Sequence, residues 1–570
     1  MRRVAPGREL EIAREFDIDR RLEVAAYLAI LALAAFLRLG NLAVRGMFDA
    51  DQGHDMLVLR ALVLDGRIPL LGPPTSIGDF HHGVLYYLLL APAAALSGGD
   101  PVAVTTWIAL GGVAAVMVTG WLARSIAGPL AGLLAALLLA VSSSAVEESV
   151  FIWNPNLIAL SSSIALAAAW QAWRSRRPGW WIAAGAAAVV TMHCHVLGTI
   201  LTPVIAGLLV ADVRRRRAVG DRAGSAAVVR AAVGWLAIAI VSYVPLAIHE
   251  IGSNGSEIRA AIAFVTGGGG PASIGLAARL PIVGLRVLGW PLTGLLTAAP
   301  LATVLSTALV AGLAIWRGWL AGRVGPGAGR TRGNAGTDAA DGNDRADERT
   351  AVRWLALGLA WTVAALAVGA SSLATVVAGL PNDHYHAFAD PIVVVLVAVG
   401  LAALIRSAMT RGARTPIGAA LAAAIVVGLV GWNVANQPPA KAADGGWAAA
   451  RAAADRVIGV AGSRPIALSS LPAFKSDEAL RMPLQASDAD VMPAGVNGAS
   501  FGGPNAVRVI LCDQLFRESI GSDCGGPAED AWLANPASGL GAGGNSIDGP
   551  AALVDRFEAA PGRWISVYAP

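Results

Sequence analysis

The chain has 570 residues, of which 55% are hydrophobic and only 14% are charged, and its formal net charge is +4 at pH 7. This is far more apolar sequence than one soluble core needs, so the composition excludes an ordinary soluble globular protein and predicts a membrane protein with many spans. A net charge so close to zero gives no indication of a nucleic-acid partner.

The chain begins with an Arg-rich segment, residues 1–21, which runs into the first apolar stretch without a small-residue cleavage site. We therefore expect a cytoplasmic tail and a first span that stays as an anchor. Many later stretches are rich in Leu, Ala and Val and are long enough to cross roughly 30 Å of hydrocarbon as helices. Apolar helices are predicted at residues 24–37, 84–97, 102–122, 129–146, 157–172, 180–193, 196–211, 231–248, 296–315, 354–370, 391–405 and 417–432.

Arg residues between these stretches predict the orientation, because cytoplasmic loops carry an excess of basic residues. The basic segments, expected in the cytoplasm, are 174–178, 214–217, 317–353 and 406–414. The Arg-poor segments, expected outside, are the first outer loop 39–82 and the segments 147–156, 193–195, 249–275 and 380–390. Within the third basic segment, residues 318–352 are polar and Gly-rich, which predicts a disordered cytoplasmic linker.

The number of crossings stays open. Twelve crossings from a cytoplasmic N-terminus would leave the C-terminus inside, whereas the local Arg distribution puts it outside. Either residues 84–97 lie in the interface, or residues 276–295 contain a further crossing. We therefore expect a membrane domain over residues 22–435 with about 11–13 helices.

After this domain the composition becomes that of a soluble protein, and residues 436–570 predict a small extracytoplasmic α/β domain. Residues 447–462 have a helical pattern, whereas 464–471, 506–513 and 563–570 resemble strands. Cys512 and Cys524 are a pair in a domain placed outside, so we expect a disulfide; the alternative is two free thiols in a reducing compartment.

The eight histidines of the chain all fall on segments assigned to the outer face: His54, His81, His82, His193, His195, His249, His384 and His386. One interpretation is that His tolerates interfaces while Arg occupies cytoplasmic positions. The other is a polar cavity open to the outer side, because ionisable groups at membrane level are costly elsewhere. Its expected lining is Asp49, Asp51, Asp79, His81, His82, Glu147, Glu148, Asn154, His195, His249, Glu250, Asp383, His384 and Tyr385.

A series of motifs along the membrane domain carries a family resemblance. In chain order they are FDADQGHDMLVLRALVLDGRIPLLGP, FHHGVLYYLLLAP, WNPNLIAL, TMHCHVLGTILTP, YVPLAIHE and DHYHAFADP. The order resembles that of the GT-C superfamily of polytopic glycosyltransferases, in the group of protein O-mannosyltransferases and aminoarabinose transferases (the glycosyltransferase 39-like, ArnT-like group). The resemblance covers about residues 20–435. It implies an all-α polytopic membrane domain of GT-C type in the plasma membrane, and it does not extend to the C-terminal domain.

The resemblance also implies a catalytic base in the first outer loop. Asp51, followed by Gln52 and Gly53, best matches the Asp-Glu-Gly form of the family, with Gln52 departing from Glu; Asp49 is the alternative. A sugar attached through phosphate already has a good leaving group, so one carboxylate that deprotonates the acceptor hydroxyl suffices. Attack from the face opposite the phosphate inverts the anomeric centre.

Further residues are candidates for binding the substrates. Arg259 and Arg286, with the histidines near residue 384, are candidates for the leaving phosphate. Aromatic and Arg residues at these places have an alternative role as interface anchors. The expected substrate-binding residues are His54, Asp79, His81, His82, Tyr86, Asn154, His195, Glu250, His384, Tyr385 and His386.

The implied partners are a polyprenyl-phosphate sugar as donor, a glycan, lipid or protein as acceptor, and the bilayer. We expect no cofactor and no metal site, because HxxxH and HExxH spacings are missing; a divalent metal is an alternative, since His and carboxylates together suit zinc or manganese. The competing function is transport of a lipid-linked glycan, but transporters often contain two similar halves and the sequence shows no such repeat. For the C-terminal domain we expect glycan or acceptor binding.

Overall fold

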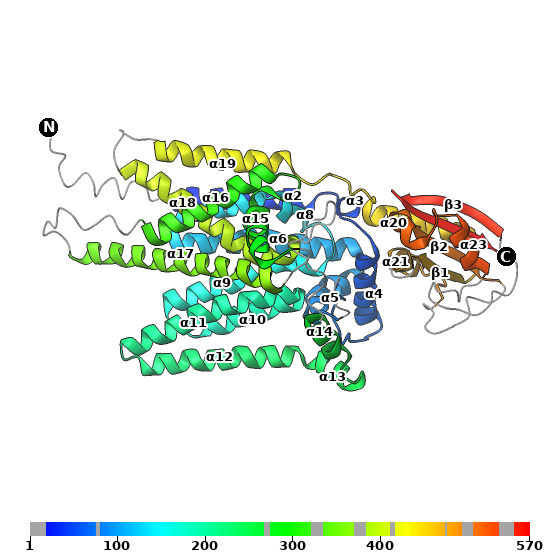
Figure 1. Cartoon of the computed structure of the whole chain (residues 1–570), viewed down its shortest axis with the longest axis horizontal. Helices are drawn as coiled ribbons and strands as arrows, with labels where there is room; N and C mark the ends of the chain where they lie inside the picture. The colour runs from blue at the N-terminus through cyan, green and yellow to red at the C-terminus, as the bar shows by residue number, and fades with distance from the viewer. Residues whose placement is uncertain are drawn as a thin grey trace.

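The computed structural model describes residues 19–75, 80–266, 274–320, 335–369, 383–410, 417–472, 476–492, 505–534 and 552–570. Figure 1 shows two parts, an elongated bundle of helices and a small domain with a β-sheet at one end of it. Helix α4 (Ala50–Leu64) lies at the end of the bundle that faces the small domain. The candidate site lies at this end.

Eight helical stretches among the described residues are long and apolar enough to cross a membrane. They are Arg20–Leu39 (α2), Pro101–Ala127 (α6), Val196–Ala218 (η2, Val196–Ile200, and α11, Leu201–Ala218), Arg222–Ser242 (α12), Pro300–Leu320 (α16, Pro300–Ile315, and η3), Ala346–Gly369 (in α17), Asp383–Ser407 (η5, Asp383–Ala389, and part of α18, Asp390–Thr410) and Ile417–Ala435 (α19). Three shorter apolar helices are α5 (Leu85–Ser97), α7 (Pro129–Val141) and α10 (Gly179–Cys194). The predicted polytopic helical architecture is confirmed.

The remaining elements of the bundle are shorter or less apolar. They are α3 (Leu42–Arg45), α8 (Ser143–Glu147), η1 (Asn154–Leu157), α9 (Ile158–Ser175), α13 (Val244–Gly252), α14 (Ser256–Thr266) and α15 (Leu276–Thr293). Residues 276–295, which were left open as a further crossing, thus contain a helix, and Pro281 and Pro291 both lie inside it.

Part of the expected disordered linker at residues 318–352 is helical. Residues 316–320 form the π-helix η3 (Trp316–Leu320), and α17 (Ala335–Gly369) begins at Ala335. Glu348 in α17 accepts a hydrogen bond from Arg317 and lies 3.6 Å from the guanidinium of Arg406. Glu348, one of the charges that suggested a solvated linker, therefore pairs with Arg residues of neighbouring helical segments. Residues 321–334 lie outside the described part of the chain.

Close helix packing in the bundle depends on small residues. A Cβ atom at Gly132 in α7 would lie 2.1 Å from the hydroxyl of Tyr27 in α2, and one at Gly120 in α6 would lie 2.9 Å from Ala136. Glycines therefore let α2, α6 and α7 approach closely, as small residues do at membrane helix interfaces.

The C-terminal domain contains a four-stranded sheet in the order β1-β2-β4-β3. Strand β1 (Ile466–Leu471) is parallel to β2 (Val507–Asp513), and β4 (Arg563–Ala569) is antiparallel to both β2 and β3 (Ala552–Ala560). Three of these strands were predicted, and β3 was not. The helices of the domain are α20 (Gly446–Ala461), α21 (Glu478–Ala486), α22 (Arg517–Ile520) and α23 (Pro527–Ala534), with the 3-10 turn η6 (Gln514–Phe516).

The apolar faces of α20 and α21 pack on one side of the sheet, against residues such as Leu468, Val509 and Ile565. On the other side, Ile510 and Cys512 pack with residues of α22 and α23. Cys512 and Cys524 form a disulfide.

Candidate functional site

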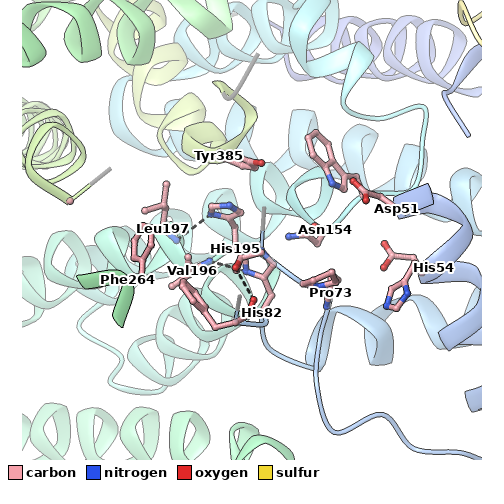
Figure 2. A pocket seen from close by; sticks show the side chains of 16 residues that line it. Asp51, His54, Pro73, His82, Asn154, His195, Val196, Leu197, Phe264 and Tyr385 are labelled. Atoms are coloured by element: carbon pink, nitrogen blue, oxygen red, sulfur yellow. Dashed lines mark hydrogen bonds between the residues drawn. The ribbon is translucent and has the colours of Figure 1, made fainter. Parts of the chain in front are cut away.

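A cavity of about 230 Å³ lies beside α4, and Figure 2 shows the side chains that line it. Its walls come from α4, from the segment before α5, from residues near η1 and η2, and from η5. The described lining residues are Asp51, His54, Asp55, Pro73, Pro74, Thr75, Phe80, His82, Trp153, Asn154, His195, Val196, Leu197, Phe264, Gly369 and Tyr385.

A capping box fixes the N-terminus of α4. Asp49 Oδ1 accepts a hydrogen bond from Ala50 N at 2.7 Å, and Gln52 Oε1 accepts one from Asp49 N at 2.9 Å. The buried Gln52 side chain also donates from Nε2 to the carbonyl oxygen of Ile152 at 2.9 Å. An ionised Glu has no donor for this bond. The departure from Glu at position 52 thus has a structural reason, because the amide ties α4 to the bundle.

Of the two predicted bases, Asp51 lines the cavity and Asp49 does not. Asp51 is exposed in the first turn of α4, where the helix dipole favours a negative charge. Asp49 is the N-cap residue, and Arg563 Nη2 donates to its Oδ1 at 2.6 Å. Asp49 therefore stabilises the start of the helix and joins it to the C-terminal domain.

His54, one turn further along α4, pairs with a residue of the C-terminal domain. Its Nδ1 lies 2.9 Å from Glu478 Oε1, at the start of α21. Burial lowers the pKa of His54, but the hydrogen bond and charge of Glu478, together with Asp55 and Asp51, outweigh burial and leave the pKa above its usual value. Glu478 therefore favours the protonated, positively charged form of His54 beside the cavity.

Asp55 is a lining residue that the sequence analysis missed. The hydroxyls of Tyr86 and Tyr87 donate to its two oxygens at 2.7 and 2.8 Å. Burial raises the pKa of Asp55 to about 7, although the tyrosines and His54 oppose this rise. The sequence did contain a signal, since Asp51 and Asp55 are four residues apart and share one helix face. Tyr86, expected to bind substrate, instead holds Asp55.

Two neutral histidines form the cavity wall opposite α4. Figure 2 shows their hydrogen bonds as dashed lines. His82 Nδ1 accepts from Val196 N at 3.3 Å, and His195 Nδ1 accepts from Leu197 N at 3.2 Å. An imidazolium has no acceptor, so both rings are neutral and carry their proton on Nε2. Burial lowers the pKa of His82 to about 3, with a smaller contribution from His81. This wall thus provides N–H donors without positive charge.

Aromatic rings extend this wall. The ring of Tyr385 stacks on His195 with centroids 4.4 Å apart, and Trp153 contacts His384 with centroids 4.0 Å apart. Asn154 is held beside them by a bond of 2.5 Å from Nδ2 to Cys194 O. Trp153, Asn154 and Tyr385 line the cavity, whereas His384 lies behind Trp153. Trp153 was not among the expected substrate-binding residues, because a Trp before a helix is more often an interface anchor.

Three predicted residues lie outside the cavity with local partners. His81 donates from its backbone N to Glu257 at 2.7 Å, and its Nδ1 lies 3.1 Å from the same carboxylate. Glu250 accepts from the backbone N of Glu257 at 2.9 Å and so fixes the start of α14. Arg259 donates to the carbonyl oxygen of Asn254. We therefore no longer expect these residues to bind substrate directly. Asp79 lies outside the described residues.

Arg286 and His386 belong to a buried cluster instead of the cavity lining. Arg286 donates to both oxygens of Asp383, at 2.8 and 2.7 Å, and His386 Nε2 lies 3.2 Å from the same carboxylate. A guanidinium that is already held by two bonds to a buried carboxylate is a poor candidate for a second anion.

Charge in the cavity is unusual for a site that would accept a phosphate. Asp51, His54 and Asp55 are the ionisable groups beside the two neutral histidines, and the described lining contains neither Lys nor Arg. Three stretches that adjoin lining residues along the chain, 76–79, 267–273 and 370–382, also contain no Lys or Arg in their sequence. In the described part of the chain, no group of three or more His, Cys, Asp or Glu residues is arranged to hold a metal ion.

Comparisons with known proteins bear on the fold. No model of a protein family matches the chain, and no curated protein matches it either. Among solved structures, it is similar to ArnT from Cupriavidus metallidurans, both in the apo state and bound to undecaprenyl phosphate. In both cases the TM-score is 0.54 at 13% identity, and the superposition covers 95% or 96% of this chain and 97% of ArnT. The similarity includes both the bundle and the C-terminal part.

Proposed function

We propose that this chain, which has the GT-C fold of glycosyltransferases such as ArnT, transfers a sugar from a polyprenyl-phosphate carrier to an acceptor hydroxyl at the extracytoplasmic face of the plasma membrane. The observation that carries the proposal is the position of Asp51, an acid on the cavity wall at the end of a membrane bundle. ArnT has been seen bound to undecaprenyl phosphate, which supports the same class of carrier here. The acceptor is a glycan, lipid or protein of the cell envelope.

The orientation is supported by two independent features. The Arg-rich segments alternate with the segments that form the cavity, which supports a position of the cavity on the side opposite to the cytoplasm. The Cys512–Cys524 disulfide in the C-terminal domain is typical of an oxidising compartment.

Asp51 acts as the general base in the proposed reaction. The acceptor oxygen attacks the anomeric carbon, its proton passes to the Asp51 carboxylate, and the bond between that carbon and the phosphate oxygen breaks with the electron pair on the phosphate. Attack and departure occur on opposite faces, so the configuration inverts. The helix N-terminus favours the ionised form of Asp51, which is the form that accepts the proton.

The two neutral histidines are the proposed donors to the departing phosphate. His82 and His195 each keep a proton on Nε2, because their Nδ1 atoms accept backbone hydrogen bonds. Trp153 and Tyr385 offer faces on which a sugar ring stacks, and the fixed amide of Asn154 offers hydrogen bonds to sugar hydroxyls. The cavity thus contains a base on one wall, and anion donors with a sugar platform on the opposite wall.

The test compares Asp51→Asn with Asp65→Asn, a variant at the exposed C-terminal end of the same helix. Purified proteins would be supplied with a set of undecaprenyl-phosphate hexoses and pentoses and with cell-envelope extract, and transfer of radioactive sugar would be measured. We expect Asp51→Asn to lower the rate by about 10² to 10⁴ while binding of undecaprenyl phosphate is retained. Asp65→Asn should behave as wild type. Unchanged transfer in Asp51→Asn would remove the catalytic assignment.

A further inference from the structure

The C-terminal domain contacts the helix that carries the candidate base at three separate points. Phe48 packs on Trp447 with ring centroids 5.0 Å apart, and Phe48 N donates to Asp444 at 2.7 Å. Arg563 holds Asp49, as described above. Helix α21 packs directly against α4, where a Cβ atom on Gly53 would lie only 2.2 Å from the carbonyl oxygen of Glu478. The domain therefore supports the helix that forms part of the cavity wall.

Glu478 is held in a single position at this contact. One carboxylate oxygen lies 2.9 Å from His54 Nδ1, and the other accepts a hydrogen bond from Ser476 Oγ at 2.8 Å. Its neighbour Arg481 is occupied by Asp477, to which it donates two bonds at 2.8 and 2.7 Å. Glu478 thus has His54 as its partner across the domain contact.

Of the two residues in the pair, His54 is the one that faces the cavity. His54 lines the cavity, whereas Glu478 is not among the lining residues and lies behind the imidazole. The charged or titratable groups that act on His54 are Glu478 from α21 and Asp51 and Asp55 from α4. A ligand in the cavity therefore meets a cation whose counter-charge belongs to the other domain.

We propose that Glu478 is a positioning residue that keeps His54 cationic and turned into the cavity, where its charge acts across the cavity on the anionic phosphate of a lipid-linked donor held at the wall of neutral histidines. The ligand in this statement rests on the proposed function; the pairing of the two residues does not. The role fits a cavity whose described lining has no Lys or Arg, because a phosphate needs at least one positive charge or several strong donors.

The sign of the effect follows from the forces on His54. Burial lowers its pKa, and Glu478 is the largest of the contributions that raise it above 6.5. Removing the Glu478 charge leaves burial opposed only by Asp55 and Asp51, so the pKa of His54 should fall. His54 would then lose its proton at a lower pH than in wild type.

The first measurement is the rate at which diethyl pyrocarbonate modifies His54, followed by mass spectrometry of its peptide as a function of pH. This reagent attacks the neutral imidazole, and the His54 side chain is 35% exposed. Glu478→Gln should move the midpoint to lower pH, while Glu478→Asp, which keeps the charge, should move it less. His249 in the same sample serves as an internal reference and should not move. The control variant is Asp555→Asn, which breaks an exposed ion pair with Arg456 elsewhere in the domain. An unchanged His54 midpoint in Glu478→Gln would overturn the proposal.

The second measurement is binding of undecaprenyl phosphate to the purified full-length protein over the range from pH 5 to pH 8. We expect Glu478→Gln to lose affinity at a lower pH than wild type does, with a difference of up to about fivefold between the two proteins, because an interaction with a charged group is replaced by one with a neutral group. Equal affinities over the whole range would refute the role of the pair in phosphate binding. If wild type binds no undecaprenyl phosphate at any pH, the proposed function and the ligand both fail, while the modification experiment still decides the pairing.

Discussion

Arg563, in the last strand of the C-terminal domain, donates a hydrogen bond of 2.6 Å to Asp49, the residue that caps the helix bearing Asp51. Two acids of one short motif therefore have separate roles. Asp49 is committed to the helix start and to the neighbouring domain, and Asp51 is turned to the cavity.

This division predicts different effects for two similar substitutions. Asp49→Asn keeps a good N-cap residue and loses only the charge that Arg563 pairs with, so we expect transfer to fall by less than about tenfold. Asp51→Asn should lose at least about 10². Initial rates of sugar transfer, with melting temperatures to verify folding, provide the comparison. A folded Asp49→Asn protein as inactive as Asp51→Asn would reverse the assignment.

Gln52→Glu introduces the residue of the Asp-Glu-Gly form that this motif resembles, and we expect it to destabilise this protein. The ionised Glu would still accept from Asp49 N, but it would bury a charge and leave the Ile152 carbonyl without its donor, at a cost of about 1–3 kcal/mol. Because the buried carboxyl would have a raised pKa, the loss should be larger at pH 8 than at pH 5.

The measurement for this variant is thermal denaturation in detergent at both pH values. Gln485→Glu, at an exposed position of α21, is the matched control and should change little. Equal stability of Gln52→Glu and wild type at pH 8 would show that the amide is not required.

Gly53→Ala tests the backbone contact between the two parts of the protein. The added methyl group meets the Glu478 carbonyl, so α21 must move away from α4. We expect faster proteolysis at the junction near residue 440 and lower transfer. Gly207→Ala, in helix α11 with open space around its Cα, should leave both properties unchanged. Identical proteolysis patterns of the two variants would argue against a tight contact.

The raised pKa of Asp55 predicts that the stability of the folded protein depends on pH. Its pKa is raised from 3.8 to about 7 in the folded protein, so the folded state keeps a proton that the unfolded state has released between these values. Stability should therefore fall as the pH rises from about 4 to about 7, by up to a few kcal/mol. Asp55→Asn does not titrate and should lack this contribution. Melting temperatures of both proteins between pH 4 and pH 8 measure the difference, and parallel curves would contradict the expectation.

Much of the helical bundle could be predicted because a membrane-spanning helix needs a continuous apolar stretch, which is visible in the local sequence. Stretches such as 102–122 and 417–432 are apolar over the length that a membrane requires, and they form α6 and α19. The strands around Val509 and Ile565 were predicted for a similar reason, since buried strands are continuous apolar runs. Strand β3 was missed because it is largely exposed and contains charged residues.

The site was predicted only in part, because its decisive contacts join residues far apart in the chain. Asp51, His82, Asn154, His195 and Tyr385 do line one cavity, as their shared assignment to the outer face suggested. Nothing in the sequence connects His54 with Glu478, which is 424 residues away. Arg286 looked available for phosphate because its partner Asp383 lies 97 residues further on. Which residues pair across the fold depends on the tertiary structure, so these pairs could not be predicted from local sequence patterns.

The distance along the chain between α4 and its partners also concerns how the protein is made. Asp49 and Arg563 are 514 residues apart, so the ribosome produces the helix long before the strand that holds it. During synthesis the wall beside α4 is missing, and a product that stops before residue 563 lacks this anchor. The contact by which the C-terminal domain supports α4 therefore forms only after most of the chain has been synthesised.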